Sequence, residues 1–135
     1  MYKRNLVFVV EDTMNNKYGY YYNGLINPNN LNHYSKTNNS FLFTLKSNGR
    51  VNGMLKFNQK INSSGFYLAD KNDQRLFGIE GGFYIYKEEI KYQSIVYENI
   101  NCFEFNGIIK VFHQDLIPGF GVTFTPKRFM VIQMI

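Results

Sequence analysis

The sequence has a single cysteine, Cys102, and only two histidines among its 135 residues. One cysteine excludes an internal disulfide and fits a reducing compartment such as the cytoplasm. Spaced metal motifs such as HxxxH or CxxC are missing, and a metal site commonly needs three or four convergent ligands. We therefore expect neither a bound metal nor another cofactor.

Long apolar runs are missing as well. The first apolar run, Leu6–Val10, has five residues, whereas a membrane-spanning helix needs about 20. A signal peptide would need a longer apolar region followed by a cleavage site. The sequence therefore predicts a cytoplasmic protein that does not insert into a membrane.

Clustered charge is the third missing feature. The chain carries a net charge of +5, but its lysines and arginines are dispersed along the sequence. Binding to nucleic acid requires such residues to gather on one face or along one element. We therefore expect no nucleic-acid partner.

The chain is rich in aromatic residues, and in several stretches the side chains alternate between two faces with a period of two residues. It contains 13 Phe and 11 Tyr, which favour strands. In FLFTLK (41–46), Phe41, Phe43 and Leu45 share one face, and LVFVV (6–10) is apolar on both faces. Further strand candidates are KYGYYY, GFYLA, RLFGIE, FYIYKE, IIKVFH, GVTFT and FMVIQM. Many short strands with frequent turns predict one all-β or β-rich α+β domain, an antiparallel sandwich or barrel.

The stretch RLFGIEGGFYIYKEE contains two adjacent glycines, Gly81 and Gly82. A phosphate-binding glycine loop joins a strand to a helix, but the residues after Gly82 alternate as in a strand. Glycine also supplies the positive φ angles that tight hairpin turns need. The pair therefore predicts a β-hairpin with a structural role.

Four blocks of the sequence, in order, resemble the TLDc domain of oxidation-resistance proteins. The blocks are LVFVVEDTMNNKYGYYY, FLFTL, GIEGGFYIY and FTPKRFMVIQM, and they extend over Asn5–Met134. The residues that carry the family motif are Gly19, Phe41, Phe43, Gly78, Gly81, Gly82 and Phe83.

The resemblance implies a fold of two antiparallel sheets packed as a sandwich, with few short helices. It also implies a non-enzymatic interaction module in protection against oxidative stress, with subunits of the vacuolar proton-pumping ATPase as protein partners. Residues 1–135 would form a single TLDc-like domain that lacks the family's opening segment. A shortened family copy without retained function is a weaker alternative.

The expected loss of the opening segment has a physical consequence. If Leu6–Val10 is an interior strand of the family's sheet, the loss of its neighbour leaves an exposed apolar edge. An open edge invites pairing with another chain. We therefore expect self-association through this edge strand, or a partner that covers it.

Cys102 is one of two speculative functional candidates. A nucleophilic or redox-sensing thiol needs a base or a positive charge that lowers its pKa. The neighbouring residues, NINCFEFN, supply neither. A core or loop thiol is the simpler interpretation.

Glu80 is the other candidate, because it borders the Gly81-Gly82 turn, where function is often located. Paired carboxylates can supply a general acid and base. The alternative function is therefore a small β-rich enzyme or ligand-binding domain that uses carboxylates near this hairpin. Alternation puts His113 and Asp115 on one face with Val111, where a solvated strand end explains them more simply than catalysis. Enzymatic activity stays an open question, although no GxSxG elbow is present.

Overall fold

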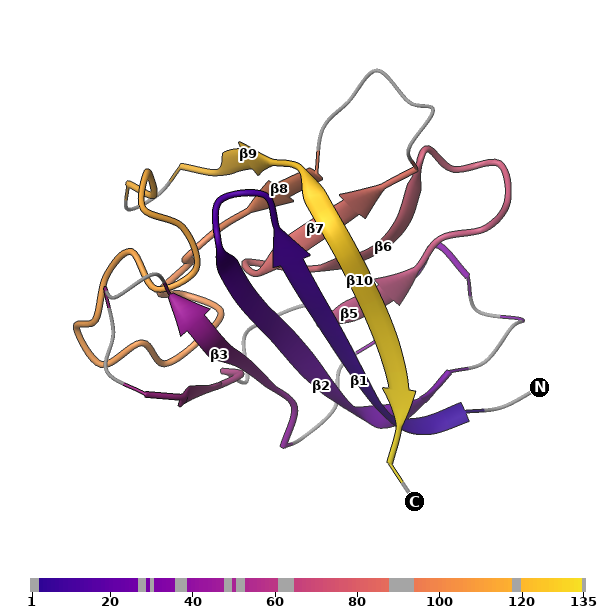
Figure 1. The fold of residues 1–135 in the computed structure, drawn as a ribbon. Coiled ribbons are helices and arrows are strands. Elements are labelled where there is room, and N and C mark those ends of the chain that lie inside the picture. Colours follow the sequence, from indigo (N-terminus) through magenta and orange to yellow (C-terminus); the bar gives the residue numbers. More distant parts are fainter. Residues whose placement is uncertain are drawn as a thin grey trace.

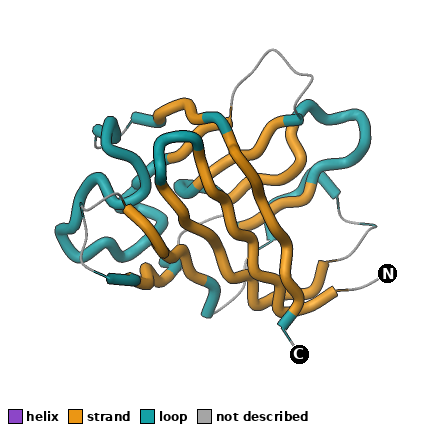
Figure 2. Tube along the Cα trace, in the orientation of Figure 1, coloured by secondary structure: helices purple, strands orange, loops and turns teal. Residues whose placement is uncertain are grey.

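The computed structural model contains two five-stranded antiparallel sheets. The described residues are 3–26, 29, 31–35, 39–47, 50, 53–60, 65–87, 94–117 and 120–134. Within these ranges the chain forms strands and loops but no helix, as Figure 2 shows. The expected antiparallel sandwich is confirmed, whereas the few short helices do not occur in the described part. The stretch of the sequence with the strongest helical character is KEEIKYQ (87–93), and only Lys87 of it is among the described residues.

The first sheet has the strand order β10-β1-β2-β3-β4. Its strands are β1 (Lys3–Asp12), β2 (Asn16–Ile26), β3 (Phe41–Ser47), β4 (Leu55–Asn58) and β10 (Pro126–Gln133). The second sheet has the order β5-β6-β7-β8-β9. Its strands are β5 (Phe66–Leu68), β6 (Arg75–Ile79), β7 (Phe83–Tyr86), β8 (Ser94–Val96) and β9 (Val122–Phe124). Figure 1 shows the second sheet behind the first, with its strands running across those of β1, β2 and β10.

The chain passes from one sheet to the other between β9 and β10. Thr125 alone separates the two strands, and its carbonyl accepts a hydrogen bond of 3.1 Å from the Thr13 N–H in the β1–β2 turn. This crossing makes β10 the edge strand of the first sheet (Figure 1).

The expected exposed edge at Leu6–Val10 is wrong. β1 pairs with β2 on one side and with β10 on the other, with Leu6 opposite Gln133 and Val10 opposite Phe129. The backbone groups of β1 are therefore used on both sides. The apolar edge of the sheet lies instead at β10, which a local reading of the sequence could not locate.

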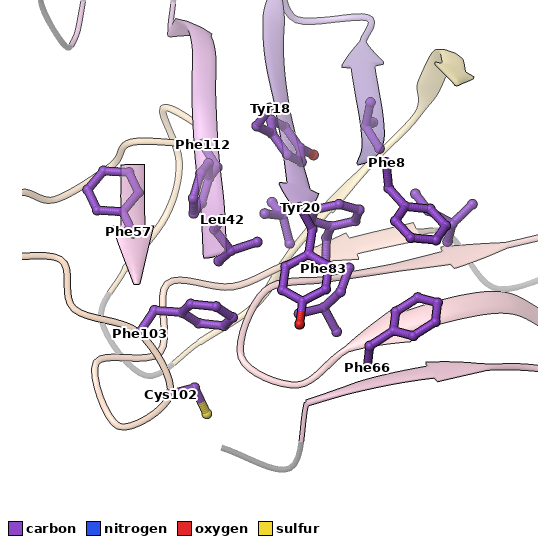
Figure 3. Packing of buried hydrophobic residues seen from close by; sticks show 14 of the residues in the cluster. Phe8, Tyr18, Tyr20, Leu42, Phe57, Phe66, Phe83, Cys102, Phe103 and Phe112 are labelled. Atoms are coloured by element: carbon purple, nitrogen blue, oxygen red, sulfur yellow. The ribbon is translucent and has the colours of Figure 1, made fainter. Parts of the chain in front are cut away.

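Aromatic side chains fill the space between the sheets (Figure 3). Alternation in β2 directs Tyr18, Tyr20 and Tyr22 into this core. The Tyr18 ring lies 5.4 Å from the Phe83 ring and 5.3 Å from the Phe112 ring, measured between centroids. Phe112 comes from the irregular segment after β8, so this segment completes the core at one end of the sandwich.

A polar network fixes that irregular segment. The Glu98 carboxylate accepts hydrogen bonds from the N–H groups of Lys110 (2.8 Å), Val111 and Phe112 (3.1 Å). Arg50 donates to the carbonyls of Lys110 (2.5 Å) and Val111 (3.1 Å). These contacts take the place of a strand partner, so the prediction of a strand at IIKVFH (108–113) is wrong.

His113 also differs from its expected environment. It is buried, and its Nδ1 accepts a hydrogen bond of 3.1 Å from the Asp115 N–H. A solvated strand end does not describe this position. The contact is local and structural, since the imidazole accepts a hydrogen bond from a backbone N–H two residues further along the chain.

Candidate functional site

The outward side of the first sheet is unusually apolar. Strand register places one row of outward residues at Met130, Val9, Gly19, Phe43 and Lys56. The next row consists of Ile132, Val7, Tyr21, Phe41 and Asn58. The solvated side of an antiparallel sheet normally carries polar residues. We call the accessible apolar members the outer aromatic face: Val7, Tyr21, Phe41, Phe43, Met130 and Ile132. Val9 is on the same side of the sheet but is only 6% exposed.

The aromatic rings of this face contact one another. The Phe41 ring lies 5.2 Å from the Tyr21 ring and 6.2 Å from the Phe43 ring. The Lys56 ammonium lies 4.3 Å from the centroid of the Phe41 ring, within the range of a cation–π contact. The face is therefore a preformed aromatic surface with a cation at one side.

Gly19 explains how the Phe43 ring fits on the sheet. A Cβ at position 19 would lie 2.5 Å from Cζ of Phe43 and 2.2 Å from the Phe8 carbonyl oxygen. Glycine is therefore required because the ring occupies the space above its α-carbon. Three residues of the predicted family motif, Gly19, Phe41 and Phe43, thus lie together on this face.

Basic side chains border the outer aromatic face. Glu11 lies 3.8 Å from each of three cations, Lys17, Lys127 and Arg128. One carboxylate cannot neutralise three cations, so this border stays positive. A partner that covers the face would meet apolar side chains at the centre and positive charge at one rim.

The outward side of the second sheet holds an open concavity of about 310 Å³. Its lining residues are Arg75, Glu80, Gly81, Tyr84, Tyr86, Ile95, Tyr97 and Asn99. We call it the tyrosine concavity. The rings of Tyr84 and Tyr97 meet edge to face with centroids 6.1 Å apart, and the hydroxyls of Tyr84 and Tyr34 lie 3.0 Å apart.

Arg75 lines this concavity, and Gly78 packs against the Tyr84 ring that lines it. A Cβ at position 78 would lie 2.5 Å from ring atoms of both Tyr67 and Tyr84, so these rings lie against the glycine. The Arg75 guanidinium lies 4.9 Å from the Tyr67 centroid and 6.0 Å from the Tyr84 centroid. Burial raises the pKa of Tyr84 well above its usual value, and the Tyr34 hydroxyl adds to this increase. Tyr84 is thus a neutral hydrogen-bonding group at physiological pH.

The Gly81-Gly82 turn is the predicted β-hairpin between β6 and β7. The Gly82 N–H donates to the Ile79 carbonyl at 3.0 Å, and Gly81 has a φ of 76°. A single positive φ at the third residue is the pattern of a type II turn rather than a primed turn. Gly82 packs against Leu42 of the first sheet, and Phe83 lies in the core.

The two speculative candidates, Glu80 and Cys102, have different surroundings. Glu80 is half-buried and lines the tyrosine concavity. Cys102 is only 5% exposed and belongs to the hydrophobic core, where Figure 3 shows it beside Phe103. The fold brings the turn at Gly81 against Cys102, but it places the thiol in the core instead of among the lining residues.

Sequence reasoning missed most of the concavity. The alternation in FYIY already put Tyr84 and Tyr86 on one face, which was the available signal. Arg75 begins β6 and Tyr97 directly follows β8, and the pairing of both strands with β7 brings these residues beside Tyr84 and Tyr86. In the described part of the chain, no three His, Cys, Asp or Glu residues are placed to hold a metal ion.

Comparison of the chain with protein-family models, curated proteins and solved structures finds no match. The resemblance to TLDc domains therefore depends on the residues themselves. None of the described residues belongs to a helix that is long and apolar enough to cross a bilayer.

Proposed function

We propose that this chain is a non-enzymatic protein-interaction module of the TLDc type, and that it binds its partner through the outer aromatic face. One observation carries the proposal: apolar and aromatic side chains occupy a sheet surface that would otherwise be polar. Aromatic residues and methionine are enriched at protein interfaces, whose rims are polar.

The resemblance supplies the candidate partner and setting. The TLDc resemblance implies subunits of the vacuolar proton-pumping ATPase as the partner proteins. It also implies that this binding takes place in the cytoplasm, as part of the protection against oxidative stress. The basic border formed by Lys17, Lys127 and Arg128 favours a partner whose contact region carries acidic residues at its rim.

Affinity capture with matched variants tests this proposal. Phe41→Gln removes the ring that contacts both Tyr21 and Phe43 on the outer aromatic face. Ile109→Gln changes an exposed apolar residue in the irregular segment. We expect the wild type and Ile109→Gln to enrich proton-pump subunits over bare beads, and Phe41→Gln to lose at least 90% of that enrichment. Thermal melting must first show that all three proteins are folded. No enrichment by the folded wild type, or equal enrichment by both variants, would overturn the proposal.

A ligand-binding domain is the second candidate, and the position of Glu80 favours it. Glu80 lies in the tyrosine concavity together with Arg75 and Asn99, so a carboxylate, a cation and an amide surround three tyrosine rings. Such a mixture of aromatic surface and few polar groups is typical of small-molecule sites. Glu80 is the one carboxylate among the described lining residues, which supports binding rather than a two-carboxylate reaction.

Thermal-shift screening with small polar metabolites tests this second function. A ligand of the tyrosine concavity should raise the melting temperature of the wild type. Tyr97→Ala and Glu80→Gln should each abolish that shift, whereas Phe41→Gln should preserve it. A shift that survives in Tyr97→Ala would place the ligand elsewhere.

A further inference from the structure

The strand β10 forms one edge of the first sheet, and among the described residues no strand pairs with its outward side. Its central residues are substantially exposed, with Val131 at 48% and Ile132 at 45%. An exposed, apolar edge strand is a template for pairing with another strand.

The backbone geometry identifies which groups of β10 point outward. The Met134 N–H donates to the Asn5 carbonyl at 2.9 Å, so the backbone of Met134 faces β1. Along an antiparallel strand, successive residues direct their N–H and C=O groups to opposite sides. Phe129, Val131 and Gln133 therefore present their N–H and C=O groups to the outward side.

The usual protection of an edge strand covers only the start of β10. Pro126, Lys127 and Arg128 stand at this end, and the β1–β10 register shifts between Glu11 and Asp12. Proline, lysine and bulges are devices that prevent edge-to-edge pairing. From Phe129 to Gln133 the strand has no proline, no charge and no register shift.

We propose that a second copy of this chain pairs antiparallel with β10, so that two five-stranded sheets join into one of ten strands. With the two-fold axis at Val131, the outward groups of Phe129 meet those of Gln133 in the other copy. Met130 then lies opposite Ile132, and two apolar side chains close over the seam on the outer side. Each outward N–H and C=O of this stretch gains a partner.

The charges of β10 select this arrangement. In the antiparallel register, Arg128 lies opposite Met134, so no cation faces a cation. A parallel pair would place Lys127 and Arg128 against their own copies, which is destabilising. The strand is therefore self-complementary in charge, in hydrogen bonding and in apolar character. This interface goes beyond the proposed function, because it uses the edge of the sheet. It shares Met130 and Ile132 with the outer aromatic face but leaves Tyr21, Phe41 and Phe43 free for a partner protein.

Light scattering and sedimentation over about 1–300 μM protein test the dimer. We expect a concentration-dependent rise toward twice the chain mass of 15.9 kDa. Because each copy carries a net charge of +5, added salt should strengthen the association. A strand from an acidic partner would give the opposite salt dependence with that partner.

Two variants of β10 disrupt the proposed dimer in different ways, so that misfolding of one variant would not decide the test. Val131→Pro removes an outward N–H that the folded chain does not use, and proline is tolerated on the open side of an edge strand. Met130→Lys/Ile132→Lys places lysine opposite lysine across the two-fold axis. Met54→Lys, at a residue 73% exposed and away from β10, is the matched control. We expect both β10 variants to weaken dimerisation at least tenfold and the control to leave it unchanged.

The outcomes separate this proposal from the proposed function. Phe41→Gln should dimerise as the wild type does, even if it loses the partner protein. A wild type that stays monomeric across the concentration range at high salt would overturn the β10 dimer. A dimer that both β10 variants form with unchanged affinity would overturn it as well.

Discussion

The α-carbon of Gly81 packs directly against the side chain of Cys102. A Cβ at position 81 would lie 2.6 Å from Cβ and 2.7 Å from Sγ of Cys102. The Asn99 N–H also donates to the Gly81 carbonyl at 3.3 Å, and the Cys102 N–H donates to Asn99 at 3.0 Å. The hairpin of the second sheet is thereby locked onto the irregular segment that completes the core.

This close contact predicts a large effect of Gly81→Ala on stability. The substitution places a side chain at a positive φ, which costs about 1–2 kcal/mol, and it forces Cys102 to move, which costs about 1–3 kcal/mol more. Gly107→Ala is the matched control, because Gly107 has a φ of 79° but open space around its α-carbon. Urea unfolding should show Gly81→Ala losing clearly more free energy of unfolding than Gly107→Ala. Equal losses would mean that the contact with Cys102 is easily relieved.

The burial of Cys102 predicts a slow thiol reaction. A thiol that is 5% exposed reacts with Ellman's reagent only when the surrounding structure opens. We expect native protein to react at least about 100-fold more slowly than protein unfolded in urea. Met54→Cys in a Cys102→Ala background supplies an exposed thiol for comparison and should react at the unfolded rate. Rapid reaction of native Cys102 would restore the redox-sensor interpretation.

Tyr18 and Tyr20 offer a second matched pair. Both are fully buried on the same face of β2, but the Tyr20 hydroxyl donates to Oε1 of Gln59 at 2.6 Å. The buried Tyr18 hydroxyl has no hydrogen-bond partner among the described residues. Tyr20→Phe should cost about 1 kcal/mol, whereas Tyr18→Phe should be neutral or stabilise the protein by up to about 1 kcal/mol. Calorimetric melting of the two variants gives the comparison; a loss in Tyr18→Phe as large as in Tyr20→Phe would show that the Tyr18 hydroxyl is hydrogen-bonded in solution.

The sequence predicted the sheets well because strand residues alternate with period two. KYGYYY, FLFTLK and FYIY became β2, β3 and β7. The strands β4 and β8 were missed, because stretches of four and three residues carry too little alternation to stand out. IIKVFH has the alternation of a strand, but Glu98 and Arg50 bind its backbone groups from distant positions. A tertiary contact therefore overrode the local pattern.

The candidate sites were predictable only in part, for a related reason. Alternation showed that Phe41 and Phe43 share a face, but not that this face points away from the core. Likewise, alternation put Tyr84 and Tyr86 on one face, whereas Arg75 and Tyr97, which directly follows β8, lie beside them only because β6 and β8 pair with β7. Register between strands depends on side chains far apart in the sequence. Periodicity therefore shows which residues of one strand share a face, but not which residues of other strands lie beside them.

The network around Glu98 predicts an unusual dependence of stability on pH. Burial raises the pKa of Glu98, although the three backbone N–H groups and Arg50 oppose that increase. The folded chain therefore binds this proton more tightly than the unfolded chain, whose carboxyl titrates at about 4.3. It follows that the contribution of Glu98 to the free energy of unfolding is greatest below that pH and declines as pH rises through the folded pKa. Glu98→Gln has no carboxyl to titrate at this position. The free energy of unfolding of the wild type minus that of Glu98→Gln should therefore fall as pH rises from the unfolded pKa through the folded pKa. Urea unfolding of both proteins from about pH 3.5 to 7.5 measures the difference; a difference that grows with pH would mean that the N–H donors and Arg50 outweigh burial and lower the pKa instead.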